Sequence, residues 1–172
     1  MSHKAKDMIR LEEYCRAAGL TKKYCKLLGE LSLRYYHFSW LPSLLMDSSP
    51  DTLIPLRDSL FRLGDRNRTY KEEELNRSIR LISRLDLFDI LVDRAIECVW
   101  DEILTDPDDS YMQILRYCYL DHTNEPEYDF YLRTGLSKST MYEKRGNLLI
   151  AVGLAMNGCA VPLALDALGE WG

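Results

Sequence analysis

The residues with the greatest capacity for chemistry form a polar run between positions 137 and 147, which reads SKSTMYEKRGN. Hydroxyls, a phenol, amines, a guanidinium and an amide follow one another there, and such groups hydrogen-bond to the base edges and phosphates of DNA. On a helix, Met141 and Leu148 would face inward while the polar residues project outward. We therefore predict a DNA-binding surface that comprises Ser137, Lys138, Ser139, Thr140, Tyr142, Glu143, Lys144, Arg145 and Asn147.

The side chains of this predicted surface suit different contacts. Serine and threonine reach either bases or phosphates, and Lys138 reaches phosphate or guanine. Lys144 and Arg145 are expected to hold backbone phosphates alongside the groove. The N-terminus of the helix itself favours a phosphate.

A sharp corner must bring these residues to the surface. Thr134-Gly135-Leu136 is predicted to be a tight turn, because glycine supplies the positive φ that a helix-to-helix corner requires. Ser137 is a good N-cap for a helix that continues to about Met156. Two further helices are expected before the turn, over 110–120 and 126–133, which together with the third predict a helix-turn-helix.

This segment resembles the final helix-turn-helix of sigma-factor region 4, and more closely the module of the ArpU/RinA family of phage late-gene activators. The resemblance covers about the last third of the chain. It implies an N-terminal helical region before a region-4-like module that activates phage or mobile-element late genes, such as packaging and lysis operons. The matching positions are Gly135, Leu136, Ser137, Thr140 and Tyr142, the apolar stretch 148–156, and Tyr128 and Tyr131 in the supporting helix.

The rest of the chain is also expected to be helical, which predicts an all-α fold. No sustained period-two alternation and no Asn-Gly or Asp-Gly hairpin turn occurs. Gly19 is expected to end a first helix, and Thr21 to cap a second. The N-terminal region, residues 1–64, is thus predicted to contain helices at 4–18 and 22–38, an irregular linker at 39–55 and a short helix at 56–63.

The middle segment, residues 65–108, is predicted to hold one long helix from about 72 to 104. Its apolar residues repeat in the heptad pattern of a packing seam. This seam either packs inside the monomer or forms a homodimer interface through the 75–100 helix, and the helix could also dock RNA polymerase. The seam residues are Leu81, Leu85, Phe88, Val92, Ala95 and Val99.

The charge is unevenly distributed, and this supports an alternative function. The net charge is −5, but residues 47–110 hold nine Lys/Arg against sixteen Asp/Glu, a net of −7. Such a segment could imitate nucleic acid and occupy a basic groove on RNA polymerase or a nuclease. The helix-turn-helix would then be a scaffold or a protein-binding module, in an inhibitor or adaptor such as a DNA mimic or anti-defence protein.

Enzymatic, metal-binding and membrane functions have no sequence signature. None of GxGxxG, GxxxxGK[ST], GxSxG or HExxH occurs, so we expect no enzyme and no cofactor. The cysteines form no CxxC pair, so we expect buried reduced thiols rather than a metal site. The charged N-terminus and the lack of an apolar run of about 20 residues predict a cytoplasmic protein of a bacterial host cell. The five cysteines are Cys15, Cys25, Cys98, Cys118 and Cys159.

Overall fold

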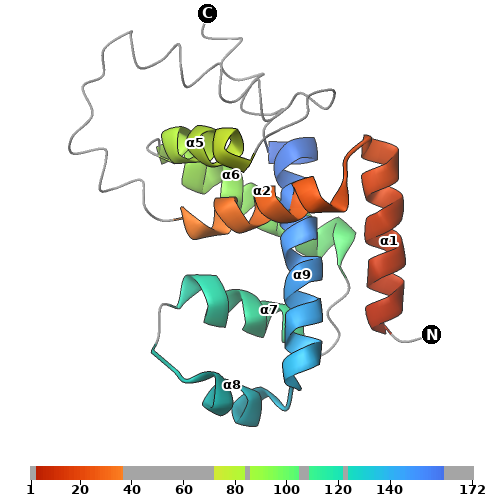
Figure 1. Ribbon diagram of the computed structural model, residues 1–172, viewed down its shortest axis with the longest axis vertical. Helices are drawn as coiled ribbons and strands as arrows, with labels where there is room; N and C mark the ends of the chain where they lie inside the picture. Colours follow the sequence, from red (N-terminus) through yellow and green to blue (C-terminus); the bar gives the residue numbers. More distant parts are fainter. Residues whose placement is uncertain (1–2, 37–71, 84–85, 105–108, 122–123, 161–172) are drawn as a thin grey trace, which may run out of the picture.

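A computed structural model describes residues 3–36, 72–83, 86–104, 109–121 and 124–160 (Figure 1). These residues are helical throughout, with short connections and no strand, so the predicted all-α fold is confirmed. No helix within these ranges has the length and apolar character needed to cross a bilayer. The elements are α1 His3–Ala18, α2 Lys22–Arg34, α5 Glu72–Ile82, α6 Asp86–Cys98, α7 Ser110–Leu115, α8 Glu127–Thr134 and α9 Lys138–Ala155, with single π-helical turns at Val99–Ile103, Arg116–Leu120 and Met156–Ala160.

Helix α9 is the centre of the structure. In Figure 1 it runs along the long axis, α2 crosses it, and α1 lies beside it, while α7 and α8 gather around its N-terminal end. The crossing with α2 is unusually close. A Cβ added at Gly29 would lie 1.9 Å from the Leu149 carbonyl oxygen, and one added at Gly153 would lie 1.8 Å from the Cys25 carbonyl oxygen. The two backbones therefore touch, and only glycine fits at either position.

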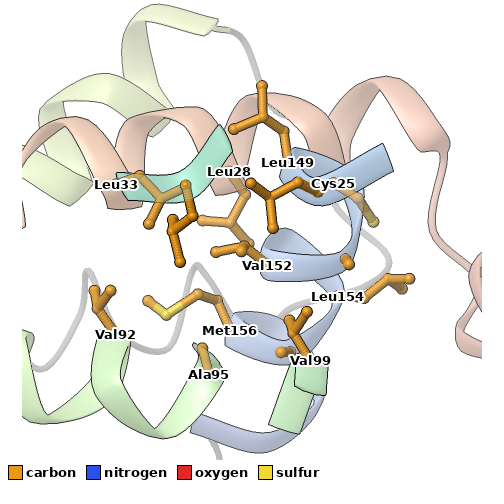
Figure 2. Packing of buried hydrophobic residues seen from close by; sticks show 14 of the residues in the cluster. Cys25, Leu28, Leu33, Val92, Ala95, Val99, Leu149, Val152, Leu154 and Met156 are labelled. Carbon is orange, nitrogen blue, oxygen red and sulfur yellow. The ribbon is translucent and has the colours of Figure 1, made fainter. Parts of the chain in front are cut away.

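The core forms around the C-terminal half of α9. Figure 2 shows Leu149 and Val152 directed toward Leu28 of α2, while Val92 and Ala95 of α6 close the other side. All five side chains are buried, as interdigitated packing of three helices requires. Helix α9 therefore shares one core with α2 and α6.

The connection between α1 and α2 agrees with the predicted local chemistry. Gly19 adopts a φ of +70°, and the following N–H of Leu20 donates to the Cys15 carbonyl at 2.9 Å, which closes the end of α1. The Thr21 hydroxyl accepts from the Tyr24 N–H at 3.1 Å and caps α2. Both predicted roles are confirmed.

Helix α2 ends at Arg34, four residues before the predicted end at Phe38. The two tyrosines that follow turn away toward other helices. The hydroxyl of Tyr35 donates to the Asn76 side chain at 3.1 Å, and that of Tyr36 donates to the Asp93 carboxylate. Burial and this carboxylate raise the pKa of Tyr36. These tertiary contacts outweigh the helical pattern of the sequence.

The predicted long central helix is wrong in one respect, since two helices, α5 and α6, occupy its place. The backbone leaves the helix at Ser83, whose hydroxyl donates to the Arg80 carbonyl at 2.7 Å. A serine that bonds back to its own helix competes with continued helical hydrogen bonding. Helix α5 buries Leu75 and Ile79 and packs against α2.

The heptad seam packs inside this chain. Phe88, Val92, Ala95 and Val99 are all buried in the shared core, so this face of α6 is already covered within the monomer. Leu85 lies outside the described residues, as do the predicted linker and short helix before residue 64 and most of the C-terminal tail.

The cysteines that the structure describes are free thiols. Cys15 and Cys25 are buried, with their sulfur atoms 4.0 Å apart between α1 and α2. Burial raises the pKa of both thiols, which keeps them protonated and unreactive. Cys15 and Cys25 therefore pack in the core as small apolar side chains do.

The α2–α9 crossing predicts a contrast among three glycines. We expect Gly29→Ala and Gly153→Ala each to lower the free energy of unfolding by about 2 kcal/mol or more, because the added methyl overlaps a carbonyl. Gly146 of α9 is the matched control, since a Cβ added there would meet nothing nearer than the Lys26 ammonium at 4.0 Å. Gly146→Ala should raise stability by up to about 1 kcal/mol through helix propensity. Urea denaturation measures all three, and equal stability of the first two variants with wild type would contradict the close crossing.

Candidate nucleic-acid interface

The corner between α8 and α9 is a glycine turn followed by a capped helix. Gly135 adopts a φ of +75°, and its N–H donates to the Tyr131 carbonyl at 2.9 Å. The Thr134 hydroxyl donates to the Phe130 carbonyl at 2.8 Å and accepts from the Leu136 N–H. The Ser137 hydroxyl accepts from the Thr140 N–H at 3.2 Å and caps α9. The predicted turn and N-cap are confirmed.

The helices before the corner hold it in place. The predicted 110–120 helix is present as α7 followed by a π-helical turn, and the predicted 126–133 helix is present as α8. The rings of Tyr117 and Phe130 stack with centroids 4.2 Å apart and an interplanar angle of 13°. The Tyr117 hydroxyl also donates to the Glu125 carbonyl at 2.8 Å. Aromatic stacking and this hydrogen bond hold α8 and the residues before it against the π-helical turn that follows α7.

The N-cap and first two turns of α9 present several of the predicted contact residues together. Ser137, Lys138 and Ser139 are exposed, and the Tyr142 side chain is 45% exposed. Thr140 is half-buried. The Lys138 ammonium lies 5.8 Å from the centroid of the Tyr142 ring, within cation–π range. The arrangement places hydroxyls, a phenol and one cation on a single protruding helix end.

Lys144 and Arg145 differ from the expectation that they project freely, because both are half-buried against aromatic rings. The Lys144 ammonium donates to the Ser110 hydroxyl and lies 4.8 Å from the centroid of Tyr111. The Arg145 guanidinium donates to the Tyr119 hydroxyl at 3.2 Å. Long cationic side chains cover apolar surface with their stems and stack on rings, so a phosphate would have to compete with these internal partners. Glu143 is also half-buried.

The predicted outward position of Asn147 is wrong. Asn147 is only 5% exposed, and its amide donates to the Tyr111 hydroxyl at 3.5 Å. The physical reason is that α7 packs over this part of α9 and covers position 147. Asn147 is therefore a core residue, and it belongs to no surface that DNA could reach.

Sequence reasoning missed a buried polar chain that joins three helices. Tyr111 of α7 accepts from Asn147 of α9 and donates to the Asp7 carboxylate of α1 at 2.9 Å. Asp7 is 4% exposed, and its spacing offers a signal, because Leu11 and Cys15 follow at intervals of four and are also buried. Position 7 thus lies on the inward face of α1.

Beside the end of α9, α8 and the residues before it carry carboxylates. Glu127 accepts hydrogen bonds from the hydroxyls of Tyr131 and Tyr142, both at 3.3 Å. Glu125 forms a two-pronged ion pair with Arg133, with N–O distances of 3.1 and 3.0 Å, and this hydrogen bonding lowers the pKa of Glu125. A phosphate backbone would therefore meet a favourable potential at the first turn of α9 and an unfavourable one beside α8.

Comparisons with known proteins give no relative, since no family model, no curated protein and no solved structure matches this chain. Within the described ranges, no three His, Cys, Asp or Glu side chains lie together in a metal-binding group.

The buried polar chain predicts a stability effect away from the exposed helix end. Tyr111→Phe removes the hydroxyl that satisfies both Asp7 and Asn147, so we expect a loss of about 2 kcal/mol in the free energy of unfolding. Tyr128→Phe is the control, because that side chain is 71% exposed and should tolerate the same change. Thermal unfolding followed by circular dichroism compares the two, and equal melting temperatures would rule out the polar chain.

Proposed function

We propose that this protein is a sequence-specific DNA-binding transcriptional regulator, an activator of phage or mobile-element late genes. One observation carries the proposal. The N-cap and first two turns of α9 expose Ser137, Lys138, Ser139 and Tyr142 directly after a glycine corner, while the second half of the same helix is buried in the core. The resemblance of this segment to the ArpU/RinA module supports the choice of function, and the promoter class follows from that resemblance alone.

The proposed contact is an end-on insertion of α9 into the major groove. The N-terminus of α9 offers the positive end of the helix dipole to a phosphate. Lys138 suits guanine or a phosphate, and the hydroxyls of Ser139 and Thr140 suit either bases or phosphates. Tyr142 sits one turn further along, close enough to Lys138 for the pair to form one surface. RNA polymerase and a second copy of the chain are the further partners that an activator would need.

A second candidate function is an acidic protein-binding inhibitor or adaptor. It is favoured by a row of carboxylates on α6 and the π-helical turn after it, where Asp93, Glu97 and Asp101 recur every four residues and all are exposed. Such a row imitates the regular charges of a phosphate backbone and would suit a basic groove on another protein.

The DNA-binding proposal predicts a local loss of affinity. Lys138→Ala and Tyr142→Ala should each weaken binding to a specific duplex roughly ten-fold or more, because they remove contacts to bases or phosphates. Fluorescence anisotropy at two salt concentrations measures the affinity, with duplexes from upstream of the protein's own gene and from the neighbouring operon's promoter. Lys138→Ala should also reduce the salt dependence by about one phosphate contact.

The matched control is Lys23→Ala, which removes the same charge from an exposed position on α2. It should leave affinity for the specific duplex nearly unchanged, and circular dichroism should show all variants folded. A scrambled duplex tests specificity. No binding to any duplex at low salt, or full binding by both α9 variants, would reject the DNA-binding proposal. Loss of a protein partner in Glu97→Lys would then favour the acidic adaptor.

A further inference from the structure

The outer side of α8 carries two large apolar side chains that nothing in the described chain covers. Tyr128 is 71% exposed and Leu132 is 67% exposed, and they lie one helical turn apart. Beside them on the same side lie Asp129 and Arg133, also one turn apart and exposed. The surface therefore consists of an apolar pair next to a pair of opposite charges.

This surface is rigidly held. On the inner side of α8, Phe130 is fully buried and stacks on Tyr117. The Arg133 guanidinium is oriented by its two bonds to Glu125, which leave N–H donors free for another acceptor. A preorganised helix face loses little conformational entropy when a partner binds.

We infer that the outer side of α8 binds the same surface of a second copy, with the two helices antiparallel about a two-fold axis. An antiparallel arrangement sets Tyr128 against Leu132 of the partner subunit, and Asp129 against Arg133 of the partner subunit. Two-fold symmetry repeats both contacts, so the apolar pairs meet each other and each Asp129 reaches an Arg133 whose guanidinium already holds Glu125 of its own subunit. A parallel arrangement would instead bring like charges together, which is unfavourable.

The other dimer face that the sequence suggested is occupied, because Phe88, Val92 and Ala95 of the heptad seam are buried in the chain's own core. The α8 surface is short, so the expected dimer is weak in solution and is strengthened when two copies bind adjacent sites. The inference extends the proposed function, since a two-fold dimer would present one α9 to each half of a palindromic site. Self-association itself does not depend on DNA binding.

Sedimentation velocity of the full chain from low to several hundred micromolar tests the inference. Wild type should shift from monomer to dimer, and Leu132→Asp should weaken this association roughly ten-fold or more by placing a carboxylate in the contact. The matched control is Ile90→Asp, which makes the same kind of change at a side chain of α6 that is 62% exposed. The control should dimerise like wild type.

A mixing experiment identifies the charge pair. Asp129→Lys alone should not dimerise, because the introduced ammonium would face Arg133 of the partner subunit. Arg133→Glu alone should not dimerise either, because the introduced carboxylate would face Asp129 of the partner subunit. An equal mixture of the two variants should dimerise, since both contacts of the mixed pair join opposite charges. Circular dichroism should show each variant folded. An effect confined to one chain cannot produce this complementation.

Three outcomes would overturn the inference: a wild type that stays monomeric at every concentration, a dimer that survives Leu132→Asp, or a mixture that fails to associate while wild type does. Anisotropy separates this failure from failure of the proposed function. A protein that binds its duplex as a monomer would keep the DNA-binding proposal and reject the dimer. A dimer without duplex binding would do the reverse.

Discussion

The contact between the backbones of α2 and α9 is the constraint on which the rest of the structure depends. Gly29 and Gly153 allow the two helices to approach until carbonyl groups of one nearly touch the other. This approach fixes where α9 crosses α2, and therefore which residues of α9 enter the core. It also leaves the first turns of α9 beyond the crossing, where they project toward α7 and α8 (Figure 1). The N-terminal end of α9 is thus exposed because the core packs against the other end of the same helix.

The buried hydrogen bonds among Asp7, Tyr111 and Asn147 also fix how α9 is rotated about its own axis. A hydrophobic contact tolerates rotation of a helix, whereas a hydrogen bond among Asp7, Tyr111 and Asn147 is satisfied only in one register. These hydrogen bonds link α1, α7 and α9, so they fix the orientations of the three helices relative to one another. Closer to the surface, the cationic side chains of Lys144 and Arg145 of α9 pack on the rings of Tyr111 and Tyr119.

The parts of the fold that depend on local chemistry could be predicted from the sequence. Gly135 and Ser137 specify a turn and a cap through backbone conformation and one hydrogen bond, as do Gly19 and Thr21, and neither needs a distant partner. The remaining features depend on tertiary contacts. Ser83 ends α5 although the apolar pattern continues, and Asn147 is buried because a helix far away in sequence covers it. Gly29 and Gly153 lie 124 positions apart, and no local pattern relates them.

Helix α9 is continuous for 18 residues, about 27 Å. Its C-terminal half is buried in the core, whereas its first turns are largely exposed. Substitutions in the C-terminal half disturb packing against α2, while those among the exposed positions of the first turn leave the core unchanged. A lineage could therefore exchange one set of surface side chains for another at little cost in stability. The helix thus separates positions that the packing constrains from positions that it leaves unconstrained.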